Sequence, residues 1–292
     1  MKFGVIANLQ RPGADEIIVR LVRWIEEKQV SCYFCEELRD AASGNIEIVD
    51  REDLPAISEV ILSMGGDGTL LATARLVGSR GIPILGINIG SLGFLTEQTP
   101  ETLERNLDRL VSGDYSIQER MVLTTRILND ERSEPLHALN DVVIGRKDIR
   151  MVHLALYSNG DYICSYAADG LIISTPTGST AYCLAVGGPI LNPEMDALIA
   201  SPIAPHTLTS RPLIFSAEEE LTLEVESDTD EANLSLDGQT SISLKNSDKV
   251  SICKGDYYVR LIRFRENSFY KVLRSKLQWG VLPLQSKNRS GE

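Results

Sequence analysis

One short segment, Gly65-Gly66-Asp67-Gly68-Thr69, limits the possible folds of this chain more than any other. The residues before it, 60–62, form an apolar run with β-branched members, which predicts a buried strand. The residues after it, 70–77, carry apolar side chains at helical spacing together with alanines that favour a helix. Three glycines and one aspartate therefore stand where a strand ends and a helix begins, which is typical of an α/β protein.

The composition of segment 65–69 is that of a phosphate-binding loop. Glycine permits positive φ angles and close approach of a ligand to the backbone, and the free N–H groups at a helix start attract anions. Thr69 can cap the helix or contact a phosphate oxygen. Asp67 is unexpected, because a carboxylate repels phosphate, so we expect it to act on a proton, a hydroxyl group or a metal ion. From these residues alone, a tight turn in which Asp67 only accepts backbone hydrogen bonds remains the alternative.

The pattern of apolar residues changes near Asp114. Before it, strands alternate with helices, which predicts a Rossmann-like parallel α/β domain with ligands at the carboxyl ends of its strands. After it, short apolar segments separated by turns, such as 254–256, predict an all-β, β-sandwich-like domain. We therefore expect an α/β nucleotide-binding domain at 1–114 and a β-rich domain at 115–267, with the C-terminal helix of segment 268–292 returning to the first domain.

A second unusual segment runs from Asp169 to Tyr182. A buried strand leads into a loop with five hydroxyl-bearing residues, and a helix then begins at Ala181. Hydroxyl and N–H groups at a helix start can hold a phosphate, a ribose or an amide, and Tyr182 can stack on a base. The more ordinary interpretation is a capped turn rich in serine and threonine. Asn140 and Asp141 precede another buried strand, where a strand-entry turn is again the ordinary interpretation.

Charge and cysteine content exclude several classes of protein. The net charge of −12 argues against a general binder of nucleic acid or of membrane surfaces, because such proteins are basic. No apolar run approaches about 18 residues, so we expect no transmembrane helix. The five cysteines, an odd number, suggest reduced thiols and a cytoplasmic location. Cys32 and Cys35 lack a second pair at metal spacing and the three histidines are scattered, so we expect no metal site built by the protein.

Taken together, the motifs resemble those of the NAD kinase family, whose members use ATP or polyphosphate. Segment 65–69 is similar to the first motif of the family, Asn140-Asp141 to the second, and 169–182 to the third. Further matching segments lie at 187–190, 202–206, 211–212 and 272–280, so the similarity covers nearly the whole chain. The first motif alone is shared with diacylglycerol, sphingosine and phosphofructo-type kinases, whereas its combination with 169–182 is far more specific.

The resemblance implies transfer of the terminal phosphoryl group of ATP to the 2′-hydroxyl of the adenosine ribose of NAD, which gives NADP and ADP. It implies Mg²⁺ as the ion that accompanies ATP, and a homodimer or homotetramer whose contacts complete an active site between the two domains. Asp67 would take the proton from the 2′-hydroxyl. The residues implied to bind NAD are Asp67, Gly68, Phe94, Asn140, Asp141, Asp169, Thr177, Thr180, Ala181 and Tyr182. Those expected on the ATP side are Arg11, Gly65, Gly66, Gly68 and Thr69.

The chain also departs from the family pattern in three places. One is Ala168, which stands before Asp169 where the family often has glycine. Asp141 stands where a glutamate is common, so its side chain is one carbon shorter. The N-terminal loop 8–13 lacks the usual Asn-Pro and a lysine, and Arg11 is the expected substitute. Two other functions fit parts of the chain: a lipid or sugar kinase that uses the same glycine loop, and a sensor that binds NAD(H) or NADP(H) without catalysis.

Overall fold

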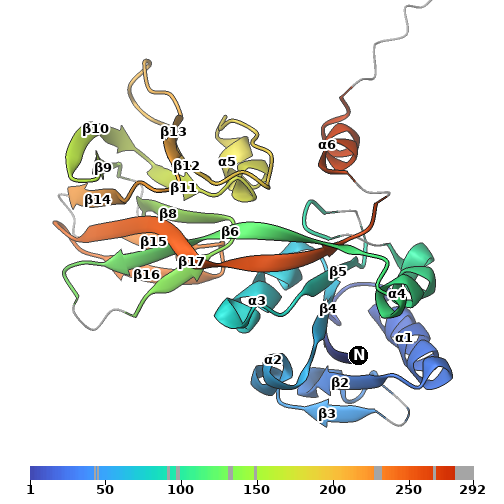
Figure 1. Cartoon of the computed structure of the whole chain (residues 1–292). Helices are drawn as coiled ribbons and strands as arrows, with labels where there is room; N and C mark the ends of the chain where they lie inside the picture. The colour runs from blue at the N-terminus through green and yellow to red at the C-terminus, as the bar shows by residue number, and fades with distance from the viewer. Residues whose placement is uncertain are drawn as a thin grey trace, which may run out of the picture.

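The structure is a computed structural model that describes residues 1–42, 44, 46–90, 93–96, 99–130, 134–147, 150–226, 232–265 and 268–279. Strands and helices alternate in its N-terminal part. These elements are β1 (Lys2–Ala7), α1 (Ala14–Lys28), β2 (Ser31–Cys35), β3 (Glu47–Val49), α2 (Leu54–Ile57), β4 (Val60–Gly65), α3 (Asp67–Val77), β5 (Ile84–Asn88) and α4 (Leu103–Ser112). The strands pair in parallel in the order β3-β2-β1-β4-β5 (Figure 1). This order matches the first five strands of the classic Rossmann order 3-2-1-4-5-6, so the predicted Rossmann-like sheet is confirmed.

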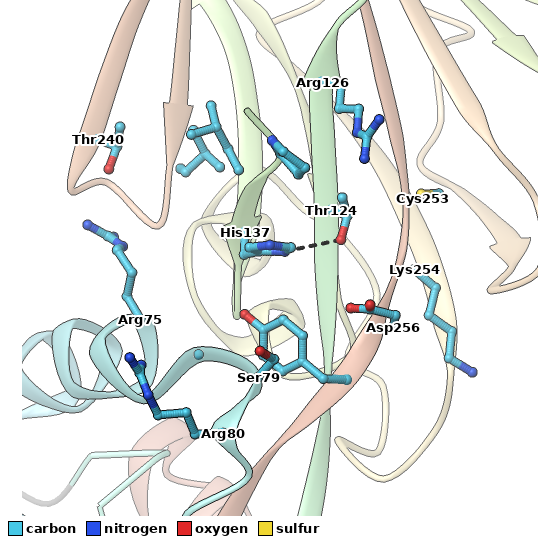
Figure 2. A pocket seen from close by; sticks show the side chains of 15 residues that line it. Arg75, Ser79, Arg80, Thr124, Arg126, His137, Thr240, Cys253, Lys254 and Asp256 are labelled. Carbon is cyan, nitrogen blue, oxygen red and sulfur yellow. Dashed lines mark hydrogen bonds between the residues drawn. The ribbon is translucent and has the colours of Figure 1, made fainter. Parts of the chain in front are cut away.

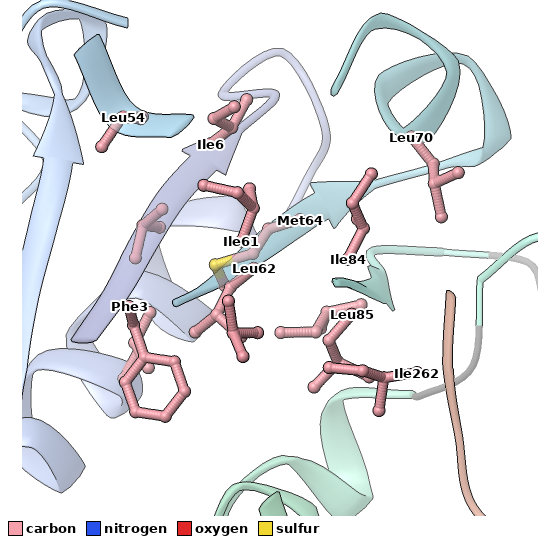
Figure 3. Close-up of a cluster of buried hydrophobic side chains, with 14 of the residues drawn as sticks. Phe3, Ile6, Leu54, Ile61, Leu62, Met64, Leu70, Ile84, Leu85 and Ile262 are labelled. Atoms are coloured by element: carbon pink, nitrogen blue, oxygen red, sulfur yellow. The ribbon is translucent and has the colours of Figure 1, made fainter. Parts of the chain in front are cut away.

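Strand β4, which carries the glycine loop, is buried along its whole length. Ile61 and Leu62 pack in the same core as Leu70 of α3, as Figure 3 shows. The hydroxyl oxygens of Ser63 and Thr73 lie 2.9 Å apart and connect β4 to α3. Because both faces of β4 are covered, the loop at its carboxyl end starts from a fixed position.

The C-terminal part contains two antiparallel sheets. The first holds β6 (Ser116–Ile127), β7 (Leu136–Ala138), β9 (Val152–Ser158), β10 (Asp161–Ala168), β14 (Leu221–Glu226) and β17 (Lys249–Arg263). The second has the order β13 (Leu213–Ser216), β12 (Ala197–Ile203), β11 (Gly170–Ser174), β8 (Asp141–Arg146), β15 (Ala232–Leu236) and β16 (Thr240–Leu244). Leu156 and Leu223 of the first sheet share one buried core with Ile173 and Leu234 of the second. The β-sandwich-like arrangement predicted from the sequence is thus confirmed.

Strands β6 and β17 run through both parts of the molecule. They pair in antiparallel fashion along their whole length, with Ile127 opposite Val250 at one end and Ser116 opposite Arg263 at the other. Leu261 of β17 also pairs in parallel with β5. One sheet therefore continues from the Rossmann-like part into the β-rich part (Figure 1). The boundary between residues 114 and 115 stays a prediction, because β6 and β17 contribute side chains to the cores of both parts.

The sequence predicts a turn at 254–256, and this prediction is wrong. Strand β17 continues through these residues, with a shift in its pairing to β6 between Lys254 and Tyr258. Lysine, glycine and aspartate favour turns, but pairing with β6 on both sides keeps the chain extended, and the irregularity takes the form of a β-bulge. The strands β12, β13 and β16 are present in addition to those expected from the sequence.

Helix α6 (Phe269–Leu277) begins after Ser268, whose Oγ accepts a hydrogen bond from the N–H of Lys271 at 3.2 Å. It follows the end of β17 that pairs with β5, and Leu273 is buried. The packing of segment 268–292 on the first domain stays a prediction, and residues 280–292 lie outside the described part of the chain. Within the described ranges, no helix has the length and apolar character needed to cross a membrane.

Candidate active site

The glycine loop places the start of α3 at the carboxyl end of β4, with Asp67 as the first helical residue. The first N–H groups of a helix have no partners within it, so this end attracts an anion. None of the three glycines of the loop has a positive φ angle, so the left-handed backbone that glycine permits is not used here. The glycines provide space instead. A Cβ at Gly65 would overlap Thr69 Oγ1, and a Cβ at Gly66 would lie 3.3 Å from Arg11 Nη2.

Arg11 brings a positive charge to this loop. The chain leaves β1 beside β4, where the N–H of Asn8 donates to the carbonyl oxygen of Met64 at 2.9 Å. The guanidinium of Arg11 then reaches Gly66, as its distance from a Cβ at that position indicates. A guanidinium next to a helix start is well suited to bind phosphate oxygens. The structure therefore brings the expected ATP-side residues together at one edge of the parallel sheet.

The carboxylate of Asp67 faces the segment that follows β5. Its Oδ2 accepts a hydrogen bond from the N–H of Phe94 at 2.9 Å, and its Oδ1 accepts from Leu95 at 3.1 Å and Thr96 at 3.4 Å. A Cβ at Gly93 would overlap this carboxylate. Asp67 thus accepts backbone hydrogen bonds, as the alternative interpretation of this loop expects. A carboxylate has about four acceptor positions, so three donors fix its orientation and leave room for a ligand hydroxyl.

Asp237, in the turn between β15 and β16, holds the segment that carries Asn140 and Asp141. Its carboxylate accepts hydrogen bonds from the N–H groups of Leu139 at 3.0 Å, Asn140 at 2.7 Å and Asp141 at 3.2 Å. Its own N–H donates to the carbonyl oxygen of Asp141 at 2.9 Å. The sequence predicts the turn at Asp237-Gly238 but not this second role, because Asp-Gly is a typical hairpin pair and needs no further explanation.

Asp141 is only 5% exposed and lies beside Asp237. Burial, followed by the charge of Asp237, raises the pKa of Asp141 to about 7. Burial also raises the pKa of Asp237, although its three backbone N–H donors act in the opposite direction. Asp141 is therefore partly protonated near neutral pH, and its carboxyl group can donate a hydrogen bond to a ligand as well as accept one.

Segment 174–180 packs against residues 139 and 140. Thr175 Oγ1 donates to the carbonyl oxygen of Leu139 at 2.6 Å, and Ser174 Oγ donates to that of Asn140 at 3.1 Å. A Cβ at Gly178 would overlap the same Asn140 carbonyl. The interpretation as a capped turn is therefore correct for these two hydroxyls, which are used within the protein.

Ala181 and Tyr182, which follow this segment directly, line a cavity. Thr177 Oγ1 is buried and has no hydrogen-bond partner among the described residues, while Thr180 Oγ1 donates to the carbonyl oxygen of Thr177 at 3.3 Å. Tyr182 is 46% exposed, so its ring is available to a planar ligand. The cavity has a volume of about 330 Å³ and is lined by Asn140, Asp141, Val143, Ala181, Tyr182, Ser235, Asp237 and Gly238.

Gln239 connects the glycine loop to the β-rich part. Its Nε2 donates to the carbonyl oxygen of Gly68 at 2.9 Å, and its Oε1 accepts from Arg75 Nη2 at 2.9 Å. Because Asp237 is two positions away, one turn contacts both the glycine loop and the segment with Asn140. Sequence reasoning missed Gln239, since no short-range pattern marks a residue that acts over such a separation.

Asp169 does not join the other expected residues. Strands β11 and β8 pair antiparallel, with Ser174 opposite Asp141 and Gly170 opposite Gly145. Asp169 therefore lies at the far end of β11, about 16 Å along the strand from Asp141. There, its carboxylate pairs with Arg146 at 3.2 Å.

No protein-built metal site is found within the described ranges, where no three His, Cys, Asp or Glu side chains are placed to hold an ion. Cys32 and Cys35 are both buried on β2, and burial raises the pKa of each thiol. These two cysteines therefore pack as apolar core residues rather than as reactive thiols.

Comparisons with known proteins agree with this geometry. The family models of the ATP-NAD kinase N-terminal and C-terminal domains match residues 3–115 and 139–264. The NAD kinase of Geobacter metallireducens is 40% identical over 288 residues, which covers 96% of this chain and 99% of the relative. The NAD kinase of Moorella thermoacetica is 40% identical over 280 residues, covering 96% of this chain and 90% of the relative.

Solved structures show the same fold. Yeast NADH kinase complexed with NADH has a TM-score of 0.90 at 22% identity, covering 98% of this chain and 90% of its own. An NAD kinase from Archaeoglobus fulgidus in complex with ATP has a TM-score of 0.76 at 24% identity, covering 95% of this chain and 99% of its own.

Proposed function

The chain belongs to the ATP-NAD kinase family, and we propose that it transfers the terminal phosphoryl group of ATP to the 2′-hydroxyl of the adenosine ribose of NAD, giving NADP and ADP. The observation in this structure that best supports the assignment is the turn 237–239, which connects the phosphate-binding loop to the pocket-lining segment with Asn140 and Asp141. Phosphoryl transfer depends mainly on holding donor and acceptor in line and on neutralising charge, so such a connection is directly useful.

Asp67 is the proposed general base. The three N–H groups of residues 94–96 hold its carboxylate in one orientation at the start of α3. In this position it can accept the proton of the ribose 2′-hydroxyl as that oxygen attacks the terminal phosphorus. A positioned base contributes about 10²–10⁴-fold to the rate of such a step.

The donor is Mg-ATP, bound at the N-terminus of α3 between the glycine loop and Arg11. Mg²⁺ comes with the nucleotide as part of the substrate, since this ion prefers phosphate and water oxygens with one or two carboxylates. Arg11 would neutralise charge on the triphosphate, in the role that the resemblance gives to a lysine. We expect ATP rather than polyphosphate as the donor.

NAD occupies the cavity beside β8 and α5 (Tyr182–Ala185) in this proposal. Asn140 and the partly protonated Asp141 would hydrogen-bond to ribose hydroxyls, and Tyr182 would stack on the adenine ring. Thr177 lies in the loop that leads to Ala181 and Tyr182, and its buried hydroxyl has no partner among the described residues. Its part in binding NAD is taken from the resemblance. Ala181 lines the same cavity, Thr180 precedes it in the chain, and Phe94 lies beside Asp67.

Asp169 would act in a neighbouring copy of the chain. It lies at the opposite end of β11 from Asp141, so it does not reach the site of its own chain. In a homodimer or homotetramer it would bind the nicotinamide carboxamide in the partner's site, as the resemblance implies. The five thiols are all free, which supports the expected cytoplasmic location.

The central test replaces Asp67 by asparagine. Asp67→Asn is expected to bind NAD within about threefold of wild type by calorimetry but to lose about 10²–10⁴-fold in NADP formation with Mg-ATP. The exposed Asp15→Asn serves as a control of equal charge change and should retain activity. Full turnover by Asp67→Asn would eliminate Asp67 as the base. Phosphorylation of diacylglycerol or a hexose in place of NAD would instead favour the other kinase classes, and tight binding without any product would favour a sensor.

A mixing experiment tests the role of Asp169. Asp67→Asn and Asp169→Asn homo-oligomers should each be nearly inactive, and subunit exchange between them should restore activity. Activity can return only if the intact Asp169 of an Asp67→Asn subunit completes the site of an Asp169→Asn subunit, which has an intact Asp67. If mixed and unmixed samples have equal activity, Asp169 does not act across a subunit contact.

A further inference from the structure

A second and larger cavity, of about 670 Å³, lies at the opposite end of α3 from Asp67. Arg75 and Arg80 line it from α3 and the turn that follows, and Arg126 of β6 lines it from the β-rich part. Figure 2 shows these arginines on two sides of His137, whose ring lies between them. Along the helix, Arg75 is about 12 Å from Asp67. None of the residues expected to bind NAD or ATP lines this cavity.

The residues that line this cavity carry a net positive charge, although the chain as a whole has a net charge of −12. Within the described ranges, neither Arg75, Arg80 nor Arg126 forms an ion pair with a carboxylate. Lys254 also lines the cavity, but its Nζ pairs with Asp196 at 2.8 Å and Figure 2 shows it pointing away. Asp256 also lines the cavity and brings one negative charge, but the three arginines outnumber it. Arginines in excess around a cavity favour a bound anion.

The lining also provides places for the rest of a small molecule. His137 Nδ1 and Thr124 Oγ1 lie 3.1 Å apart, and the His137 ring contacts Tyr257 edge to face with centroids 5.2 Å apart. Pro135 and Leu136 add apolar surface. A volume of this order is that of pockets that enclose small organic ligands.

We propose that this cavity binds a small polyanion with two or more phosphate or carboxylate groups, held by Arg75, Arg80 and Arg126. Arg75 gives the site a connection to catalysis. Its Nη2 now donates to Gln239 Oε1, while Gln239 Nε2 donates to Gly68 of the glycine loop. An anion that binds the guanidinium of Arg75 weakens the hydrogen bond from Arg75 to Gln239. Gln239 is then less fixed, and the loop that carries Asp67 shifts. This second step rests on the proposed kinase function, whereas the binding site itself does not.

The binding test is calorimetry with the full chain, using inorganic tripolyphosphate and citrate as separate probes in the absence of Mg²⁺. Arg80→Gln/Arg126→Gln is the test variant, and both side chains are exposed, so the fold should be retained. Arg23→Gln/Arg105→Gln, on α1 and α4, gives the same change in charge away from both sites. Arg11→Gln reports binding at the ATP side. Tripolyphosphate tests a phosphate ligand and citrate tests a carboxylate ligand.

We expect at least one probe to bind at a site that weakens tenfold or more in Arg80→Gln/Arg126→Gln but is unchanged in Arg11→Gln and in the charge control. If all binding of both probes survives Arg80→Gln/Arg126→Gln, or is lost in Arg11→Gln, the proposal is wrong. With Mg²⁺ in excess, the bound probe should also change kcat for NADP formation at least twofold in wild type and not in the test variant. If the probe binds but leaves kcat and KM of wild type unchanged, the connection through Arg75 is wrong. If the probe binds but no sample forms NADP, the result counts against the kinase function and not against the binding site.

Discussion

Gln239 Nε2 donates to the carbonyl oxygen of Gly68 at 2.9 Å, although 171 positions separate the two residues in the chain. Gln239 belongs to the turn whose Asp237 also holds the N–H groups of residues 139–141. One turn thus sets the position of the phosphate-binding loop relative to the proposed NAD pocket. The side chains of Asp237 and Gln239 can be replaced separately, and the expected consequences differ.

Replacing Gln239 should impair catalysis more than folding, because this residue is exposed and acts through Gly68. Gln239→Ala is expected to lower kcat about tenfold, which corresponds to loss of about 1.4 kcal/mol of positioning. Gln239→Glu keeps an acceptor for Arg75 but cannot donate to Gly68, so it should share the loss of kcat. Steady-state kinetics at varied NAD separates kcat from KM. Wild-type kcat in Gln239→Glu would mean that the bond to Gly68 does not position the loop.

Replacing Asp237 should destabilise the protein itself. Asp237→Ala leaves three backbone N–H groups without their acceptor, and we expect a loss of about 2–4 kcal/mol in the free energy of unfolding. Urea denaturation of the unliganded protein measures this change. Asp256→Ala removes an exposed carboxylate of β17 and should change stability by no more than about 0.5 kcal/mol. Equal stability of the two variants would exclude a structural role for Asp237.

The raised pKa of Asp141 predicts that the stability of the protein depends on pH. Its pKa is about 7 in the folded protein against an ordinary value of 3.8, so folding favours the protonated form. The stabilising contribution is therefore complete below pH 3.8 and is lost as the pH rises through about 7. Between pH 5 and pH 8, wild type should lose about 2–3 kcal/mol that Asp141→Asn does not lose. The two proteins are compared by urea denaturation across this range, and parallel pH profiles would contradict the prediction.

Adding a methyl group at position 93 should act on Asp67. The Cβ of Gly93→Ala would overlap the Asp67 carboxylate, so we expect kcat to fall about 10²-fold or more as the base is displaced. A double-mutant cycle isolates the cause: in an Asp67→Ala background, the same change should have almost no further effect on kcat. Additive losses would show that Gly93→Ala acts elsewhere.

Much of this architecture could be predicted from local patterns. The alternation of strands and helices before residue 114 predicts the parallel sheet, and the loop at 65–69 predicts the anion-binding start of α3. The roles of Asp237 and Gln239 could not be predicted, because Asp-Gly already explains a hairpin turn and the contacts span 96 to 171 positions. The prediction of a turn at Gly255 failed for a similar reason. Its neighbours favour a turn, and only the pairing of β17 with β6, which is distant in the sequence, keeps the strand intact. The sequence left two interpretations open for the hydroxyls of segment 174–180. The structure supports internal bonding for Thr175, whereas the Thr177 hydroxyl has no partner among the described residues.

The pairing of β6 with β17 from Ile127–Val250 to Ser116–Arg263 has a mechanical consequence. A ladder of backbone hydrogen bonds that crosses from one half of the molecule to the other resists bending far more than a single connecting segment does. We therefore expect the two halves not to close on their substrates by a large hinge rotation of the kind many kinases use, since that motion would strain the ladder. Exclusion of water during the reaction then has to come from side chains and short loops around the substrates rather than from a rotation of the two halves.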